Sequence, residues 1–453
     1  MQLRRLFVAN RGEIAVRILR TARKLGIETV LGVSMADRET LGAEMADRTV
    51  VLGPAPAGKS YLDVRLVIHA AKATGCDALH PGYGFLSEKP ALARSCESEG
   101  ISFVGPRAET IEALGDKLSA RSIADQTNVR TVPGTEHMLS LEAARTAAAA
   151  LGYPVVMKAS AGGGGRGMFK ATRAQDLEAS FDKASREAEA AFGDGRLYLE
   201  RFVERARHVE VQVLGDGDGN VVHFGDRDCS VQRRYQKLIE EAPASAVPEA
   251  TRERLHEAAI RLTSFARYRN AGTVEFLYDV DRDDFYFMEV NSRIQVEHPV
   301  SEEITGVDLI AMQLRVAGGM GLGLSQRDIT NSGHAIECRI NAEDPRNNFA
   351  PAPGRIGRWV VPNGEGIRLD THARQGYLVP PYYDSMIGKL IALGRDREEA
   401  ISRMLIAIDQ FVIEGPKTTL PLDAAIVGHS DFRNNNITTR WLEDTCLPTF
   451  LSG

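Results

Sequence analysis

The sequence has few of the features that mark secreted, membrane-spanning or zinc-binding proteins. Its 5 cysteines are scattered over 453 residues and form no CxxC pair, so neither a disulfide framework nor a zinc site is supported, and we interpret them as reduced thiols. No stretch approaches ~18 uninterrupted apolar residues, and the segment MQLRRLFVANRGE lacks the apolar region of a signal peptide. These absences predict a cytoplasmic protein with no membrane partner.

The chain also lacks an excess of positive charge. Lys and Arg total 55 and Asp and Glu total 61, which gives a net charge of −6 and a pI near 6.0. A nucleic-acid partner is therefore not expected. The composition, with 43% hydrophobic and 26% charged residues, is typical of globular proteins. At about 150 residues per domain, the length predicts several domains or subdomains.

The spacing and length of the apolar runs differ between the two halves of the chain and predict its domains. In the first hundred residues, apolar runs such as LFVA at 6–9 and ETVLGVS at 28–34 alternate with helical patterns. This alternation predicts a parallel sheet covered by helices, that is, a doubly wound N-terminal domain. From about Leu197 the apolar runs lengthen between Asp/Gly turns, which indicates an antiparallel sheet. Between the two, helices at 141–151 and 174–192 flank a strand and a glycine run and predict a small lid subdomain.

The glycine run directly follows a strand that carries Lys158. It comprises four glycines at 162–165, followed by Arg166 and Gly167. Glycines let backbone N–H groups approach phosphate oxygens closely, and a lysine on the strand adds a fixed cation. The spacing is neither that of a P-loop nor that of a Rossmann fingerprint. The run fits a lid over a nucleoside triphosphate, although a glycine run alone is equally typical of a flexible loop.

Two acidic residues lie on consecutive predicted strands within GTVEFLYDVDRDDFYFMEVN at 272–291. Glu275 is on the first strand and Glu289 on the second, so a hairpin can bring their carboxylates together. Asn291 adds a third oxygen, and magnesium prefers such ligands, with phosphates and water in its remaining positions. Acids beside a turn are more often solvated surface groups, but these two lie within apolar strands, which favours a metal site.

A dense polar run of Arg293, Gln295, Val296, Glu297 and His298 follows the predicted metal ligands. Arginine can hold a small oxyanion through two hydrogen bonds, glutamine can donate a hydrogen bond to it, and glutamate can take its proton. This set of side chains fits bicarbonate.

Other basic residues admit two interpretations each. In QRRYQK, the residues Arg233, Arg234 and Lys237 follow a strand pair, where a solvated basic face is the simpler interpretation. Arg339 stands in a predicted strand, where a structural ion pair is the alternative to ligand binding. His208 can touch a phosphate, although a lone strand histidine is more often structural.

These motifs give the whole chain a close resemblance to the biotin carboxylases of the ATP-grasp superfamily. The matching stretches are, in order, NRGEIAVRIL, HPGYGFLSE, GDK, KASAGGGGRGM, RHVEVQVL, CSVQRRYQK, EEAPA, NSRIQVEHPV, ECRINAEDP and VPPYYDSMIGKL. The resemblance implies an α/β and α+β multidomain protein. It would have an N-terminal biotin carboxylase domain at 1–113, an ATP-grasp domain at 114–330 with a mobile lid at about 132–203, and a C-terminal biotin carboxylase domain at 331–445.

The resemblance also implies an ATP site. The glycine loop and nearby basic side chains would contact the phosphates, and the segment LYLERFV would lie along the adenine. The implied ATP-binding residues are Lys117, Lys158, Gly163, Gly164, Gly165, Glu200, Arg201, Val203, His208, Gln232, Glu275 and Glu289.

The reaction implied by the resemblance begins with bicarbonate. Glu297 would remove its proton, ATP would phosphorylate it to carboxyphosphate, and Arg339, which binds biotin, would stabilise the biotin enolate that captures CO2. The implied catalytic residues are Glu297, Arg339, Arg293 and Lys237. Bicarbonate would be bound by Lys237, Arg293, Gln295, Val296 and Glu297, and two magnesium or manganese ions by Glu275, Glu289 and Asn291.

A Met-Lys-Met biotin-attachment motif is absent from the sequence, and the nearest candidate, Met157-Lys158, belongs to the strand before the glycine run. We therefore expect biotin on a separate biotin carboxyl carrier protein, or on a missing C-terminal part, with carboxyltransferase subunits as further partners. The resemblance favours the biotin carboxylase subunit of acetyl-CoA carboxylase, which serves fatty acid biosynthesis. The alternative is a subunit or module of a pyruvate, propionyl-CoA or other acyl-CoA carboxylase, because all share this half-reaction.

The chain departs from the family pattern at several positions. Tyr235 stands where the family usually has histidine, on the nucleotide side of the site. The resemblance implies a homodimer, whose surface Arg20 and Arg368 match, whereas Lys24 and Glu365 do not. Ala161 replaces a glycine of the loop and Arg201 replaces a lysine, and both changes should be tolerated.

Two other classes of function share parts of this pattern. An ATP-grasp enzyme that joins a carboxylate to an amine would need the phosphate and metal groups, but not Arg339 or the IQVEH run. A non-catalytic nucleotide-binding regulatory subunit would not need Glu297 or the metal carboxylates. Because all of these residues are present, the sequence favours a biotin carboxylase.

Overall fold

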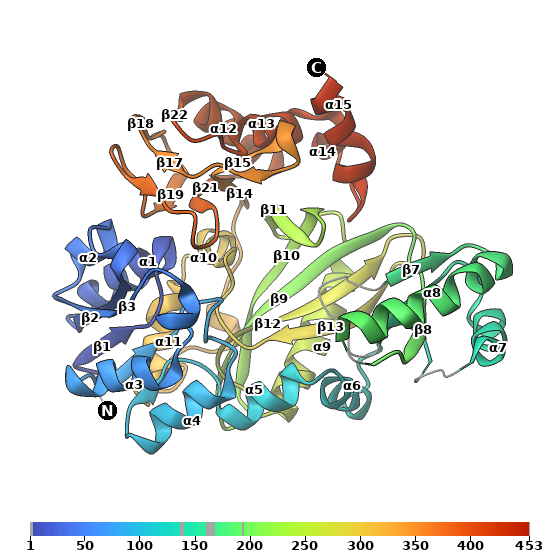
Figure 1. Cartoon of the computed structure of the whole chain (residues 1–453), viewed down its shortest axis with the longest axis horizontal. Coiled ribbons are helices and arrows are strands. Elements are labelled where there is room, and N and C mark those ends of the chain that lie inside the picture. Colours follow the sequence, from blue (N-terminus) through green and yellow to red (C-terminus); the bar gives the residue numbers. More distant parts are fainter. Residues whose placement is uncertain (1–2, 136–139, 160–167, 193, 453) are drawn as a thin grey trace.

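The computed structural model describes residues 3–135, 140–159, 168–192 and 194–452 (Figure 1). It confirms the predicted α/β and α+β multidomain fold, with a parallel N-terminal sheet, a large antiparallel sheet and a separate small sheet. The glycines 163–165 lie outside the described residues. Within the described part of the chain, no helix has the length and apolar character needed to cross a bilayer.

The N-terminal part is a parallel sheet in the order β3-β2-β1-β4-β5. Side chains of β1 alternate between two cores: Leu6 and Val8 enter one and Phe7 the other, as the two-residue period of a strand requires. Helices α1 and α2 cover the first face and α3, α4 and α5 the second, so the sheet is doubly wound as predicted. The elements are β1 (Arg5–Val8), α1 (Gly12–Lys24), β2 (Glu28–Ser34), α2 (Leu41–Met45), β3 (Arg48–Gly53), α3 (Val64–Ala73), β4 (Ala78–His80), α4 (Pro90–Ser98), β5 (Ser102–Phe103) and α5 (Ala108–Gly115).

The centre of the molecule is an antiparallel sheet of eight strands in the order β13-β12-β9-β10-β11-β14-β21-β19. Its strands are β9 (Ala206–Asp216), β10 (Val221–Arg233), β11 (Gln236–Ala242), β12 (Arg269–Asp279), β13 (Asp284–Asn291), β14 (His334–Asn341), β19 (Ile367–Thr371) and β21 (Met386–Gly394). Because β11 pairs with β14, strands that follow residue 330 extend the same sheet as those that precede it. Residues that are far apart in the sequence therefore share one face of this sheet.

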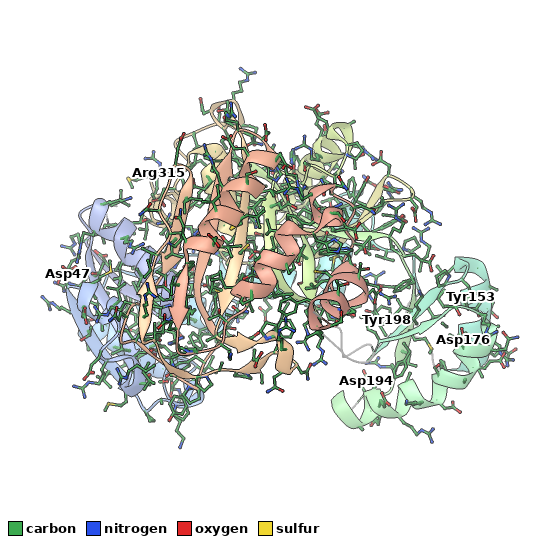
Figure 2. The ribbon with its side chains drawn as sticks, turned by 90° about the horizontal axis from the view of Figure 1, so that it is seen from above. Asp47, Tyr153, Asp176, Asp194, Tyr198 and Arg315 are labelled. Carbon is green, nitrogen blue, oxygen red and sulfur yellow. The ribbon has the colours of Figure 1, made fainter. Side chains whose placement is uncertain are left out.

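A small three-stranded sheet projects from the body and corresponds to the predicted lid (Figure 2). It consists of β6 (Val155–Ala159), β7 (Met168–Ala171) and β8 (Leu197–Arg201), with helices α7 (Leu141–Leu151) and α8 (Ala174–Phe192) packed on it. In Figure 2 the labelled residues Tyr153, Asp176 and Tyr198 all lie on this projection, on the side of the molecule opposite to Asp47. Its apolar core is separate from the other cores.

The remaining elements complete the second half of the chain. Helices α6 (Lys117–Gln126) and α9 (Glu249–Phe265) pack on one face of the central sheet, while α10 (His298–Thr305) and α11 (Leu309–Ala317) connect it to the N-terminal sheet. Helices α12 (Arg397–Gln410) and α13 (Leu420–Gly428) cover β14 and β21. Shorter elements are β15 (Glu343–Asp344), β16 (Ala350–Pro351), β17 (Gly354–Arg355), β18 (Arg358–Val360), β20 (Leu378–Val379), β22 (Val412–Glu414), α14 (Ser430–Arg433) and α15 (Leu447–Ser452).

Candidate active site

The two predicted metal carboxylates face each other across the β12–β13 hairpin. Glu275 is the register partner of Glu289, and the next pair is Phe276 with Phe287, so Met288 is an extra residue in β13. Such a bulge rotates the strand locally, and here it places Glu275 and Glu289 opposite each other at the end of the hairpin near Asn291. Glu275 is buried and Glu289 is exposed to solvent. The hairpin therefore presents a pair of carboxylates that an incoming ion can reach.

Lys237 lies at the centre of the site, on β11. Its Nζ is 3.0 Å from Oε1 of Glu275, 2.6 Å from Oε1 of Glu297 and 2.7 Å from Oε2 of Glu210. One ammonium group thus touches a predicted metal ligand and the predicted base at once. The metal site and the bicarbonate site predicted from the sequence are consequently one continuous cluster of charges.

The guanidinium group of Arg293 donates hydrogen bonds to three polar side chains. Nε donates to Oε2 of Glu88 (2.9 Å), Nη1 to Oε1 of Gln295 (2.8 Å) and Nη2 to Oδ1 of Asn291 (2.9 Å). Asn291 in turn donates from Nδ2 to Glu275 (2.8 Å). Arg293 therefore lies next to the carboxylate pair, held in a fixed plane from which it can bind an oxyanion through two hydrogen bonds.

Arg339 approaches Glu297 from the opposite side, on β14. Its Nη2 donates to Oε2 of Glu297 at 2.8 Å, and its Nε donates to Oε1 of Glu240 at 2.6 Å. Glu297 is fully buried. Burial alone would raise the pKa of Glu297, but Lys237, Arg339 and Arg227 lower it well below its usual value. Glu297 is thus an ionised carboxylate, the form that can accept a proton.

The segment that carries Glu297 is held in place by a hydrogen bond from Lys389 to the preceding residue. Glu297 precedes the first residue of α10, and the carbonyl oxygen of Val296 accepts a hydrogen bond of 2.6 Å from Nζ of Lys389. Lys389 is fully buried and also lies 3.2 Å from Oε1 of Glu13. A buried lysine from β21 therefore sets the orientation of the peptide at Val296.

The residues predicted to bind ATP lie on two surfaces. Gln232 and His208 belong to the central sheet, where Gln232 is the register partner of Lys237 and His208 Nε2 lies 3.0 Å from Glu275. Lys158 and Glu200 belong to the lid, where they pair at 2.5 Å.

The other predicted ATP-binding residues lie in or next to the lid or on α6. Lys117 is an exposed side chain at the first residue of α6. Arg201 hydrogen-bonds to Tyr286 of the central sheet, and Val203 is buried against Tyr286.

Several residues of the cluster were not singled out from the sequence. They are Glu88, Glu210, Arg227, Glu240 and Lys389. Arg227 is fully buried and donates to Glu210 (2.5 Å), which in turn holds Lys237. Glu88 and Glu240 lie in the stretches HPGYGFLSE and EEAPA. For the four that lie in strands, a charged residue inside an apolar strand was the available signal, because such a residue is rarely buried without a partner. Glu88 is exposed in a turn and carried no such signal.

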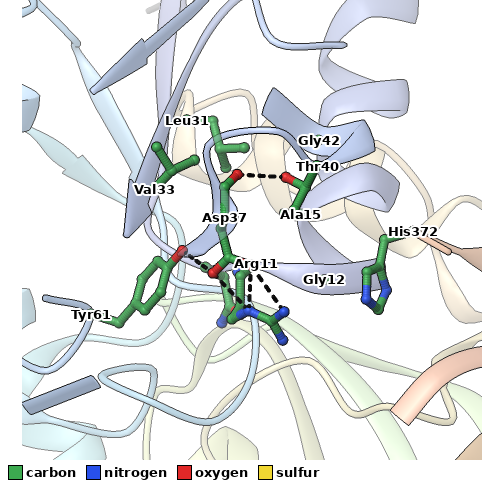
Figure 3. Close-up of a pocket in the computed structure, with 11 residues that line it drawn as sticks. Arg11, Gly12, Ala15, Leu31, Val33, Asp37, Thr40, Gly42, Tyr61 and His372 are labelled. Carbon is green, nitrogen blue, oxygen red and sulfur yellow. Dashed lines mark hydrogen bonds and ion pairs between the residues drawn. The ribbon is translucent and has the colours of Figure 1, made fainter. Parts of the chain in front are cut away.

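A separate small cavity lies in the N-terminal domain (Figure 3). Arg11 and Asp37 form an ion pair there with Nε 2.9 Å from Oδ2, and the hydroxyl group of Tyr61 donates to Asp37 at 2.7 Å. His372 from the C-terminal part closes one side. The volume of about 10 Å³ has room for one water molecule. This cluster therefore ties the N-terminal sheet to the C-terminal part and is too small for a nucleotide.

Family models match three consecutive parts of the chain. The biotin carboxylase N-terminal domain matches residues 2–111, the ATP-binding domain of the carbamoyl-phosphate synthase L chain matches 116–325, and the biotin carboxylase C-terminal domain matches 337–444. The first match covers the parallel N-terminal sheet, whereas the second and third both contribute strands to the eight-stranded central sheet. The middle match contains the carboxylates of the cluster around Lys237, namely Glu210, Glu275 and Glu297.

Known proteins resemble the chain over nearly its full length. Biotin carboxylase 1 of Bacillus subtilis is 48% identical over 97% of this chain and 98% of its own length. The biotin carboxylase of Pseudomonas aeruginosa is also 48% identical, over 97% of this chain and 98% of its own. The biotin carboxylase domain dimer of the Hydrogenobacter thermophilus 2-oxoglutarate carboxylase, solved with MgADP, ADP and bicarbonate, has a TM-score of 0.90 and 44% identity, with 98% of each chain covered.

The fold and the site together define an ATP-grasp ligase. The chain belongs to the biotin carboxylase family, and its activity is the ATP-dependent carboxylation of biotin. The resemblance stated from the sequence motifs is therefore confirmed.

Proposed function

We propose that this chain carboxylates biotin on a separate carrier protein, using ATP and bicarbonate through a carboxyphosphate intermediate. The observation that carries the proposal is the position of Lys237, which contacts Glu275 and Glu297 at once. A single cation between a metal carboxylate and a base would bring the γ-phosphate of ATP beside bicarbonate. This is the geometry that phosphoryl transfer to bicarbonate requires.

The residues present fit magnesium. Glu275 and Glu289 are register partners on adjacent strands, so two hard carboxylate ligands lie at one end of the hairpin, and Asn291, whose Nδ2 donates to Oε1 of Glu275 at 2.8 Å, lies beside them. Glu275, Glu289 and Asn291 would hold two ions, which supply charge neutralisation on the transferring phosphoryl group. Nε2 of His208 and Nζ of Lys237 also lie 3.0 Å from the carboxylate of Glu275.

Bicarbonate would bind between Arg293 and Lys237, with Gln295 and the backbone of Val296 as further donors. Glu297 accepts the bicarbonate proton, and the resulting oxyanion attacks the γ-phosphorus of ATP, so that ADP leaves and carboxyphosphate forms. Carboxyphosphate then breaks into CO2 and phosphate, and that phosphate takes the proton from N1′ of biotin. Arg339 stabilises the negative charge on the ureido oxygen while the nitrogen captures CO2.

The lid would cover the nucleotide. Lys158 would contact the phosphates, Glu200, Arg201 and Val203 would lie along the adenine, and Lys117, His208 and Gln232 would complete the nucleotide contacts. Exclusion of water by the lid protects carboxyphosphate from hydrolysis.

We also propose the partners and the cellular setting. Biotin would arrive on a biotin carboxyl carrier protein, carboxyltransferase subunits would use the product, and acetyl-CoA would be the final acceptor in fatty acid biosynthesis. Pyruvate and propionyl-CoA remain alternative acceptors, since relatives from different carboxylases share this half-reaction.

We propose a homodimer that uses Arg20, an exposed residue of α1, and Arg368. All five cysteines are free of disulfides, which fits a cytoplasmic enzyme.

The test is a measurement of ADP release by the purified full chain. We expect ADP release to depend on magnesium and bicarbonate and to be stimulated by free biotin, with carboxybiotin as the product. ADP release that depends on an amine, or that is indifferent to biotin, would refute the proposal. Copurification of a biotinylated protein with the chain would identify the carrier.

A further inference from the structure

Arg339 is held by two carboxylates on different edges of its guanidinium group. Nε donates to Oε1 of Glu240 at 2.6 Å, while Nη2 donates to Oε2 of Glu297 at 2.8 Å. Both carboxylates are fully buried. Glu297 has a chemical role in the proposed reaction, whereas the proposed reaction gives none to Glu240, which belongs to the EEAPA stretch.

Glu240 has a second acid beside it. On the pair of strands β11 and β14, Glu240 is the register partner of Glu337, so their side chains start side by side on one face of the sheet. Glu337 is fully buried as well. Among the described residues, Oε2 of Glu240 and both carboxyl oxygens of Glu337 have no hydrogen-bond partner. Three oxygen atoms of two neighbouring carboxyl groups are therefore left unsatisfied in the core.

The charges around the two acids favour a single proton between them. Glu337 faces Lys389, Arg339, Glu297 and Glu240. Lys389 and Arg339 carry positive charge, but each already has its own carboxylate, namely Glu13 for Lys389 and Glu240 for Arg339. Burial, together with Glu240, raises the pKa of Glu337 well above its usual value, and burial raises the pKa of Glu240 to about 7. Two buried carboxylates side by side cannot both ionise at low cost.

We propose that Glu240 and Glu337 are positioning residues for Arg339. Glu337 carries a proton and donates it in a hydrogen bond to Oε2 of Glu240, and Glu240 holds the Nε edge of Arg339 throughout the reaction. The Nη2 edge is thereby free to exchange Glu297 for the ureido oxygen of biotin. This inference rests on the proposed function, because it assigns a purpose to the contact between Arg339 and biotin.

In this arrangement the two edges of the Arg339 guanidinium have different roles: the Nε edge keeps its counter-charge and the Nη2 edge exchanges its partner. If Arg339 had only Glu297 as a carboxylate partner, transfer of Nη2 to biotin would leave the cation without a buried counter-charge. With Glu240 in place, the charge of Arg339 is balanced before and after the exchange. The neutral form of Glu337 is needed because a second negative charge there would repel both Glu240 and Glu297.

The kinetic test uses the full chain with Glu240→Gln. The amide can still accept the hydrogen bond from Nε, so the fold and the position of the side chain are kept, but the counter-charge is lost. We expect kcat for carboxylation of free biotin to fall by about tenfold to a hundredfold, because a neutral acceptor replaces the charged one opposite Arg339, while KM for ATP stays unchanged.

The matched control is Glu241→Gln. Glu241 is the next residue of the same strand, is also buried, and pairs with Arg397 (2.6 Å) and His334 (2.9 Å) on the other face. This variant also removes a buried carboxylate from an arginine, so it is expected to be less stable but to keep the wild-type kcat. An equal fall in kcat in both variants would show that Glu240 is structural only.

The proton shared by Glu240 and Glu337 can be detected directly by infrared spectroscopy. A protonated buried carboxyl group gives an infrared carbonyl band that carboxylates lack. In difference spectra we expect the component from Glu337 to be shifted in Glu240→Gln and lost in Glu337→Gln, while the component from the buried Asp423 stays. Because the amide of Glu337→Gln can replace the donated hydrogen bond, that variant should keep kcat within about threefold. If Glu337→Gln does not fold, the band in the wild type and its shift in Glu240→Gln still decide the point.

Failure of this inference differs from failure of the proposed function. A wild-type chain that does not carboxylate biotin would refute the function, whatever the variants do. A wild-type chain that carboxylates biotin, with unaltered kcat in Glu240→Gln and no carbonyl band from Glu337, would overturn the positioning role alone.

Discussion

Lys237 and Glu297 form a buried ion pair with 2.6 Å between Nζ and Oε1, and the same ammonium lies 3.0 Å from Glu275. One cation therefore pairs with two carboxylates in the site. In the proposed reaction, bicarbonate would take over the contact with Lys237, which would free Glu297 to act on the anion when it binds. Binding and activation of the base are therefore coupled through one lysine.

Replacement of the base should separate nucleotide binding from turnover. In Glu297→Gln, the amide retains the size of the side chain but cannot accept a proton, so we expect bicarbonate-dependent ADP release to fall by about a hundredfold or more. Nucleotide affinity, measured by equilibrium titration, should remain, because the proposed ATP contacts lie elsewhere. Glu257→Gln, on the exposed surface of α9, serves as the control and should behave as the wild type. Normal turnover in Glu297→Gln would contradict the assignment of the base.

The carboxylate pair was accessible from the sequence because its geometry is local. Glu275 and Glu289 lie on strands joined by a short Asp-rich turn, and a hairpin needs no long-range information to bring them together. The polar run from Arg293 to Glu297 follows directly and shares this advantage. The alternation of strands and helices at the N-terminus predicted the doubly wound sheet in the same way.

The partners of Arg339 could not be predicted, because they depend on the pairing of distant strands. Glu240 meets Glu337 only because β11 and β14 are neighbours in the central sheet, and the sequence pattern of neither strand specifies which strand it pairs with.

The conformation of the β10–β11 turn is a second feature that the sequence did not predict. Arg234 and Tyr235 both have positive φ, at 47° and 66°, in a two-residue turn that usually selects asparagine and glycine. Both side chains are exposed, so the pairing of β10 with β11 on either side of the turn, not turn propensity, accounts for this conformation.

The metal site predicts a specific magnesium phenotype. In Glu289→Gln, one carboxylate of the pair is lost, so the magnesium concentration for half-maximal ADP release should rise about tenfold or more. Because Glu289 is exposed, the free energy of unfolding should change by no more than about 0.5 kcal/mol. Asp281→Asn, at the turn of the same hairpin, is the matched control and should leave the magnesium requirement unchanged. An unchanged requirement in Glu289→Gln would exclude this residue as a ligand.

The buried histidine His80 predicts a loss of stability in mild acid. Burial lowers its pKa to about 3, and Nδ1 accepts a hydrogen bond from the N–H of Gly82 (3.0 Å). Below about pH 6.5 the unfolded chain gains a proton that the folded chain takes up only near pH 3. The free energy of unfolding should therefore fall by up to ~1.4 kcal/mol per pH unit across that window.

The histidine prediction is checked by urea unfolding at several pH values. His80→Asn keeps an acceptor for Gly82 but removes the titrating ring, so its unfolding free energy should depend less steeply on pH than that of the wild type. His69→Gln, which changes an exposed histidine of the same domain, should keep the wild-type slope. Equal slopes for His80→Asn and the wild type would contradict the prediction.

Lys389 should affect both stability and bicarbonate binding, and a double variant can separate the two. In Lys389→Met, the carbonyl of Val296 loses its 2.6 Å hydrogen bond and Glu13 loses its cation. The freed peptide at Val296 should raise KM for bicarbonate by about tenfold, and the unpaired buried carboxylate should cost about 3–5 kcal/mol of stability. KM for ATP should not change, because Lys389 touches only the bicarbonate side of the cluster.

Combining Lys389→Met with Glu13→Gln removes the unpaired charge but leaves the peptide at Val296 without its lysine. The double variant should therefore recover most of the lost stability, measured by urea unfolding, and still show the raised KM for bicarbonate. Recovery of both properties would mean that Lys389 only balances the charge of Glu13. Recovery of stability alone would show that a buried lysine from β21, in the C-terminal part, orients the peptide that holds bicarbonate.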